Sequence, residues 1–261
     1  VNALFEAEGK RTAVAGTIRF KVDGESTPNL YKMTMPGRFF IQRFLRSAVD
    51  AGCDVVILEM TSEGVKQSRH KWIDLDALIF TNLSPEHIES HGSFEKYIAA
   101  KFELARGLLT SRKRPRKIIA NVDDDHGKLF LSVPIEERIP YSLKDAELYT
   151  LKKDGASIVL DGVTIRTPLV GLFNVYNALA AIACARSFGI SLKTCVSAFA
   201  DLAPISGRVE QFKSPKDAEK QITAVVDYAH TPDSLTQLYE AFPKMTKICI
   251  LGNTGGGRDT W

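Results

Sequence analysis

The chain contains, at residues 79–87, the stretch Ile79-Phe80-Thr81-Asn82-Leu83-Ser84-Pro85-Glu86-His87. It starts as a short apolar strand over residues 77–80 and continues into a polar loop that ends at the histidine. Upstream, residues 55–58 form a continuous apolar run, typical of a strand covered on both faces, which ends at Glu59. In open α/β sheets, ligands bind at the carboxyl ends of the strands. We therefore expect an α/β fold with Glu59 and His87 at one edge of a sheet.

Lys101 follows this stretch on a helix predicted over residues 93–109. Apolar residues recur there at helical spacing, and at about 100° per residue Lys101 falls near the middle of their stripe. A buried ammonium group is costly unless it is paired or chemically changed. The alternatives are a snorkelling lysine, an ion pair or helix cap for Glu59, and a loop histidine with an ordinary partner for His87. Because the three occur together, we expect them to form a site for a hard cation such as Mg²⁺. A cationic lysine cannot be a metal ligand, whereas a carbamylated lysine carries a carboxylate and could be one.

Length and composition fit a globular enzyme. The 261 residues are 44% hydrophobic and 25% charged, with a net charge of +3, so nothing in the overall charge indicates a nucleic-acid partner. The basic run at residues 112–117 is predicted to be an exposed loop. The four cysteines form no C-x-x-C pair and are expected to be reduced core thiols of a cytoplasmic protein. No apolar run is long enough for membrane insertion.

The pattern predicts two α/β units, residues 1–205 and 206–261. The first is expected to contain strands at residues 12–17, 55–59, 77–81 and 117–122, a β-hairpin excursion at residues 147–169, and helices at residues 175–188 and 191–202. Residues 203–207 are the predicted linker. The second unit is expected to have strands at residues 222–226 and 247–251, with a helix that starts at Thr231-Pro232, an N-cap followed by proline.

Six blocks in this order resemble the Mur ligases, over essentially the whole chain. They are residues 58–64 with Gln67 and Arg69, residues 81–87, 97–101, 171–181, 206–210 and 227–235. The resemblance implies a central ATPase-type doubly wound sheet with a small β excursion in residues 1–205. It also implies the start of a Rossmann-like C-terminal domain in residues 206–261. The last block favours the branch that adds the third residue to UDP-N-acetylmuramoyl-L-alanyl-D-glutamate.

The resemblance also implies the chemistry, which is ATP-dependent amide formation through an acyl phosphate, in peptidoglycan precursor synthesis. Glu59 and His87 match metal-binding positions, and Lys101 matches a carbamylated lysine that orients a second Mg²⁺. Further residues match positions that bind the nucleotide in the family. Asn174 and Asn177 match positions near the adenine, Arg208 and Asp227 match positions near the ribose and the domain hinge, and His230 matches a position near the phosphates. A helix N-cap remains the alternative for Asn174, and a loop cap for Asp227.

On the acceptor side, the resemblance matches five residues to binding of the UDP-N-acetylmuramoyl-dipeptide: Thr34, Thr61, Ser62, Gln67 and Arg69. The chain departs from the family's paired threonines, since only Thr34 is kept in Lys32-Met33-Thr34-Met35-Pro36, and Glu63 replaces a usual histidine. The segment that reads the incoming amino acid, lysine or diaminopimelate, is expected beyond Trp261. The protein is expected to act as a monomer.

A phosphate loop of the form G-x-x-x-x-G-K-[ST] is absent from the 261 residues, and the run at residues 252–259 has arginine where lysine and threonine belong. In the family this loop lies just before a helix that matches residues 1–7, so the chain is expected to start after it and to be a poor catalyst alone. Two alternatives stay open. One is another Mur or folylpolyglutamate-type ligase, and the other is a nucleotide-binding scaffold without activity.

Overall fold

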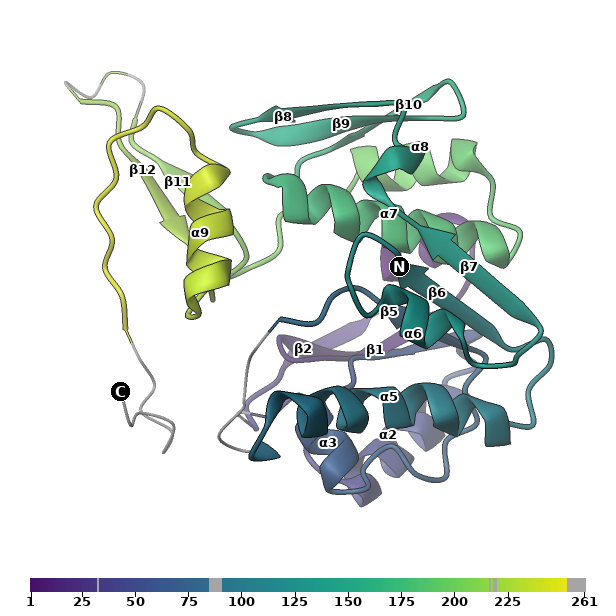
Figure 1. Cartoon of the computed structure of the whole chain (residues 1–261). Coiled ribbons are helices and arrows are strands. Elements are labelled where there is room, and N and C mark those ends of the chain that lie inside the picture. Colours follow the sequence, from purple (N-terminus) through teal and green to yellow (C-terminus); the bar gives the residue numbers. More distant parts are fainter. Residues whose placement is uncertain (32, 85–90, 216, 218–219, 253–261) are drawn as a thin grey trace.

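The computed structural model describes residues 1–31, 33–84, 91–215, 217 and 220–252 (Figure 1). The mixed first sheet has the order β3-β2-β1-β4. Its strands are β1 (Thr12–Ala15), β2 (Arg19–Val22), β3 (Glu25–Pro28) and β4 (Val55–Leu58). β1 and β4 are parallel and in register from Thr12 opposite Val55 to Ala15 opposite Leu58. The predicted strands at residues 12–17 and 55–59 therefore end side by side, which puts Glu59 at a carboxyl edge.

The second sheet is parallel, with the order β5-β6-β7. Its strands are β5 (Ala77–Phe80), β6 (Lys117–Asn121) and β7 (Glu137–Tyr141). Every residue of β6 is buried because helices cover both faces. Ile119 packs into a core with α7 (Leu172–Ser187), whereas Ile118 and Ala120 pack into a second core with α5 (Phe94–Thr110). Figure 1 shows α7 and α5 on opposite sides of this sheet.

Six further helices complete the chain that the structure describes, besides a 3₁₀ turn at Leu143–Asp145. α1 (Asn2–Ala7) and α8 (Leu192–Ala200) pack in the first core with α7. α2 (Arg38–Asp50) covers β1 and β2 through Phe44 and Ala48. The others are α3 (Ser62–Lys66), α6 (Gly127–Leu131) and α9 (Pro232–Glu240).

The predicted β excursion is a three-stranded antiparallel sheet rather than a single hairpin. β8 (Leu148–Lys152), β9 (Gly155–Leu160) and β10 (Val163–Thr167) are ordered β10-β9-β8. Asp161 and Gly162, which join β9 to β10, both have positive φ, as a tight hairpin turn requires. The apolar face of β9 and β10 joins the first core through Ile158 and Ile165.

The C-terminal unit is an antiparallel pair, β11 (Glu210–Lys213) and β12 (Thr223–Val226), with α9 beside it (Figure 1). A small core of Val170, Val209 and Phe242 joins this unit to the start of α7. The strand predicted at residues 247–251 is not formed, because these residues have no ladder partner in the described chain. Ile248 and Ile250 are 92% and 97% exposed, and Cys249 is exposed instead of being a core thiol.

The basic run at residues 112–117 forms a loop up to Arg116 and enters β6 at Lys117, and nearby carboxylates pair with several of its charges. Arg112 pairs with Asp74 at 2.7 Å, and Arg116 donates to both oxygens of Glu136 at 2.9 and 2.8 Å. Arg116 and Lys117 are buried, contrary to the prediction of an exposed loop, and each has a glutamate partner that compensates its charge. The run therefore presents much less positive charge than its sequence indicates.

This arrangement predicts a pH-dependent contribution to stability from Glu136. The Arg116 guanidinium lowers the pKa of Glu136 from 4.5 to about 2. A depressed carboxyl pKa stabilises the fold above the unfolded value, and that stabilisation is lost as the pH falls from about 4.5 toward about 2. Glu136→Gln should therefore lower the free energy of unfolding at pH 7, and the deficit should shrink below pH 4.5. Urea unfolding at pH 7 and pH 3 measures this, with the exposed Glu25→Gln as control; a deficit equal at both values would contradict it.

Candidate active site

Glu59 is held in place at the carboxyl edge of β1 and β4 by Thr17. The backbone N–H of Thr17 donates to one carboxylate oxygen of Glu59 at 2.7 Å, and its hydroxyl donates to the other at 2.8 Å. Gly16 leaves the room for this, since a Cβ there would lie 2.9 Å from Glu59 Oε2. Glu59 is an exposed carboxylate with a fixed orientation, and its partners are the Thr17 groups rather than the ion pair or helix cap considered from the sequence.

Thr34 joins the same cluster through its hydroxyl, which lies 2.8 Å from that of Thr17. A hydroxyl has one proton to donate, and Thr17 gives its proton to Glu59, so Thr34 is the donor in this pair. The structure therefore brings a predicted acceptor residue, Thr34, next to a predicted metal residue, Glu59. Sequence reasoning did not single out Thr17, although it is the last residue of the strand predicted at residues 12–17, two positions after the observed end of β1 at Ala15.

Thr61 and Ser62 have local roles at the start of α3. The Thr61 hydroxyl caps the helix by accepting from the N–H of Gly64 at 3.1 Å. Ser62 is buried, and its hydroxyl lies 3.1 Å from Nε2 of His91. Burial lowers the pKa of His91, which favours the neutral imidazole near pH 7. His91 is a second residue that sequence reasoning missed, and it lies four positions after the predicted ligand His87 in the sequence.

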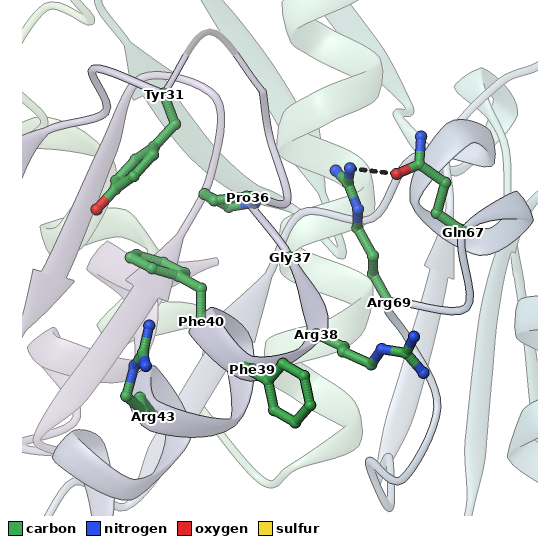
Figure 2. A pocket seen from close by; sticks show the side chains of 9 residues that line it. All are labelled: Tyr31, Pro36, Gly37, Arg38, Phe39, Phe40, Arg43, Gln67 and Arg69. Carbon is green, nitrogen blue, oxygen red and sulfur yellow. Dashed lines mark hydrogen bonds between the residues drawn. The ribbon is translucent and has the colours of Figure 1, made fainter.

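Gln67 and Arg69 meet at the end of α3. The guanidinium of Arg69 donates to Oε1 of Gln67 and to the carbonyl of Met35, which places it beside the Met33–Pro36 segment. Both side chains line a cavity of about 500 Å³ (Figure 2). Three of the five predicted acceptor residues, Thr34, Gln67 and Arg69, are thus connected through this segment and α3.

Lys101 lies on α5, the helix predicted for it, which packs against α3. It is half-buried rather than fully buried, and its Nζ lies 5.1 Å from the centre of the Tyr97 ring. Tyr97 also contacts His91 in a T-shaped arrangement, with the ring centres 5.4 Å apart. His87 lies outside the described residues, so its predicted place beside Glu59 and Lys101 stays a prediction.

The predicted adenine residues are neighbours in the first turns of α7. Asn174 is buried, and its amide donates to the carbonyl of Val170 at 2.8 Å and accepts from Asn177 at 3.1 Å. The N-cap of α7 is Gly171, so the cap alternative for Asn174 is wrong. The side chain of Asn177 is exposed, which leaves its amide oxygen accessible to a ligand.

The predicted ribose and phosphate residues gather around Tyr228. The Arg208 guanidinium lies 4.8 Å from the centre of the Tyr228 ring, and His230 Nδ1 lies 2.9 Å from the Tyr228 carbonyl. Asp227 accepts from the N–H groups of Val209 and Ala229, each at 2.7 Å. It therefore acts as the loop cap considered from the sequence. Because Val170 and Val209 share one small core, this cluster is tied to the Asn174 end of α7.

The described residues fit a magnesium ion only if substrate phosphates and water supply most of its ligands. Among the described residues, no group of three His, Cys, Asp or Glu side chains could hold a metal ion. Mg²⁺, however, is commonly bound by one or two carboxylates together with substrate phosphates and water. Glu59 supplies one such carboxylate at an exposed strand edge, so it fits this kind of site.

Comparisons with known proteins identify the family of this chain. Residues 1–185 match the family described as the Mur ligase middle domain. The chain belongs to the Mur ligase family. Its relatives include the UDP-N-acetylmuramoyl-L-alanyl-D-glutamate–2,6-diaminopimelate ligases of Geobacillus kaustophilus, 33% identical over 99% of this chain and 54% of the relative, and of Thermosynechococcus vestitus, 35% identical over 99% and 53%. This Mur ligase chain thus spans about half the length of the curated relatives it matches.

Solved structures support the fold of a Mur ligase. A UDP-N-acetylmuramoyl-L-alanyl-D-glutamate–2,6-diaminopimelate ligase superposes with a TM-score of 0.71 at 28% identity, covering 91% of this chain and 49% of that one. MurF from Acinetobacter baumannii also reaches 0.71, at 16% identity over 94% and 51%, which bears on the fold alone. The α/β fold predicted for a Mur ligase central domain is therefore confirmed. Among the described residues, no helix is long and apolar enough to cross a bilayer.

Proposed function

We propose that this chain forms the metal-binding core of an ATP-dependent ligase that joins an amino acid to UDP-N-acetylmuramoyl-L-alanyl-D-glutamate. The observation that carries the proposal is the hydrogen-bonded set Glu59, Thr17 and Thr34 at the carboxyl edge of β1 and β4. It joins a fixed carboxylate to an acceptor-side hydroxyl at the place where α/β sheets bind ligands. The names of the similar proteins support the same reaction.

In this reaction the acceptor carboxylate attacks the γ-phosphate of ATP, and the amino group of the incoming amino acid then displaces phosphate. Mg²⁺, when bound, neutralises charge on the phosphoryl oxygens. Glu59 would hold the metal, with His87 and a carbamylated Lys101 as further proposed ligands. Thr34, Thr61, Ser62, Gln67 and Arg69 would orient the acceptor, whose reacting carboxylate must lie in line with the phosphate.

The nucleotide would lie where α7 meets the C-terminal unit. The free amide face of Asn177 would pair with adenine, which presents both a donor and an acceptor, while the buried Asn174 positions Asn177. Arg208 and His230 would contact the ribose and phosphates, and Asp227 would hold their loop through its two backbone hydrogen bonds. We propose residues 1–205 and 206–261 as the two domains that contribute to this site, in a cytoplasmic monomer.

A ligation assay on the complete gene product tests the proposal. With UDP-N-acetylmuramoyl-L-alanyl-D-glutamate, ATP and Mg²⁺, we expect phosphate release only when an amino acid is also present. We propose 2,6-diaminopimelate for this role because the relatives at 33% and 35% identity are named for it, and L-lysine is the comparison substrate. Mass spectrometry of the product identifies the residue added.

Other outcomes would assign a different function. Ligation of glutamate to folate, or of D-alanyl-D-alanine to the tripeptide precursor, would replace this proposal with another ligase of the same fold. ATP hydrolysis that ignores both substrates, or no turnover with any of them, would overturn the ligase proposal and favour a nucleotide-binding scaffold.

A further inference from the structure

A second set of basic side chains lies beside the acceptor residues and is not used by the mechanism above. The cavity of about 500 Å³ that Gln67 and Arg69 line is also lined by Arg38 and Arg43 of α2, and by the rings of Tyr31, Phe39 and Phe40. Figure 2 shows Arg38 and Arg69 on one side of Gly37, and Arg43 with Tyr31 and Phe40 on the other. A basic cavity with aromatic walls therefore opens at the start of α2.

No acidic side chain in the lining of this cavity compensates its positive charge. Its nine lining residues include three arginines and no acidic side chain. In the part of the chain that the structure describes, neither Arg38 nor Arg69 forms a salt bridge, and the guanidinium of Arg38 lies 5.8 Å from the centre of the Phe39 ring. Like charges that share one concave surface repel each other and raise the local concentration of anions.

Arg69 and Arg38 differ in how firmly they are held. Arg69 is fixed by Gln67 and by the Met35 carbonyl, so its direction is set before any ligand binds. Arg38 is exposed and makes no side-chain hydrogen bond within the described residues, so its five donors are available. A guanidinium with free donors that lines the same cavity as a fixed one suits a ligand with a second anionic group, because arginine binds carboxylate and phosphate in a bidentate manner.

We propose that Arg38 is a specificity-determining residue that binds an anionic group of the acceptor, in addition to the group held by Gln67 and Arg69. This inference rests on the proposed function, because the acceptor it names is the substrate of that reaction. The ligand chemistry is a carboxylate or phosphate next to an apolar or sugar body, which the walls of Tyr31, Phe39 and Phe40 accommodate. A carboxylate of the peptide is the expected source, since Gln67 and Arg69 line the same cavity.

The test measures the acceptor KM and acceptor binding in the complete gene product. Arg38→Ala should raise the KM for UDP-N-acetylmuramoyl-L-alanyl-D-glutamate by about tenfold, as expected for loss of a charge-assisted hydrogen bond, and leave kcat and the KM for ATP unchanged. Arg38→Lys should recover part of the loss because it keeps the charge. The control is Arg46→Ala on the same helix, which is 74% exposed, pairs with Asp50 and does not line the cavity.

An acceptor that carries D-isoglutamine in place of D-glutamate identifies the source of the anion. If the effect of Arg38→Ala disappears with this amide, Arg38 binds the peptide carboxylate, and if it persists, Arg38 binds the pyrophosphate. Equal acceptor KM and equal calorimetric Kd for Arg38→Ala and the unchanged protein would overturn the inference even if ligation is observed. Arg38-dependent binding of the acceptor without ligation would support the site and refute the proposed reaction.

Discussion

Replacing Lys101 with alanine is expected to lower the turnover of the complete gene product by roughly a hundredfold or more. Loss of one preorganised charged group next to a phosphoryl group in transfer has an effect of this size. The unmodified ammonium group cannot ligate a metal ion, whereas a carbamate on Nζ can. The half-buried position of Lys101 beside the Tyr97 ring lowers the solvation of a charged group, which favours chemical modification or a fixed partner. Bicarbonate should not restore the variant, while a short carboxylic acid should do so in part.

Two comparisons separate this role from a structural one. Lys96→Ala, at an exposed position of the same helix, should keep near-normal turnover. Protein equilibrated with ¹³C-labelled bicarbonate should show a carbamate carbon signal by NMR that Lys101→Ala lacks, and circular dichroism should show that both variants are folded. Near-normal turnover of Lys101→Ala, or the same labelled signal in that variant, would refute the carbamate.

Three of the strands predicted from the sequence were found because helices cover both faces of their sheets. β4, β5 and β6 are continuous apolar runs because helices cover both faces of a parallel sheet, and that pattern is visible in a single sequence. β7 was missed because Glu137-Arg138-Ile139-Pro140-Tyr141 mixes charges with a proline, which an edge strand tolerates. β2 and β3 were missed although Asp23-Gly24, a typical hairpin turn, joins them.

The wrong predictions share a physical cause, which is that burial depends on partners distant in sequence. Residues 247–251 have strand propensity, but a strand needs a neighbour to bond, and none lies beside them in the described chain. Arg116 and Lys117 look like loop residues until Glu136 and Glu137 are placed next to them by the register of β6 and β7. Lys101 keeps part of its surface exposed, as a snorkelling side chain does.

The candidate site was predictable in its residue types more than in its contacts. Glu59 was placed at a strand end by the apolar run before it, and the parallel pairing of β1 with β4 confirms that position. The hydrogen-bond partner that orients a carboxylate cannot be read from a single sequence, so the role of Thr17 was found only from the structure. The place of Arg38 in the wall of the cavity was likewise found only from the structure, since an arginine early in an amphipathic helix usually indicates a solvent-facing position.

Glu59→Gln is the second change with a large expected effect. The amide keeps the shape of the side chain but removes the negative charge that a magnesium ion requires, and Gln presents one acceptor oxygen where Glu presents two. We expect turnover at saturating ATP to fall by roughly a hundredfold or more, because the metal ion that stabilises charge during phosphoryl transfer would be bound less well. Thr17 Oγ would then face the amide in a pairing of neutral groups, which holds the side chain less firmly.

Thr17 provides the graded comparison for this prediction. Thr17→Val removes the hydroxyl bond to Glu59 and leaves the backbone N–H bond of residue 17 in place, so the carboxylate stays near the edge with less orientation. The Mg²⁺ concentration that gives half-maximal rate should rise by about tenfold, a typical effect of removing a group that orients a metal ligand, and Thr17→Ser should restore it. Electron paramagnetic resonance measures Mn²⁺ affinity in the presence of ATP without turnover. The affinity should be weaker in Thr17→Val than in the unchanged protein and should recover in Thr17→Ser. If Thr17→Val and Glu59→Gln both leave Mn²⁺ affinity unchanged, Glu59 is a structural carboxylate and the metal is bound by other residues.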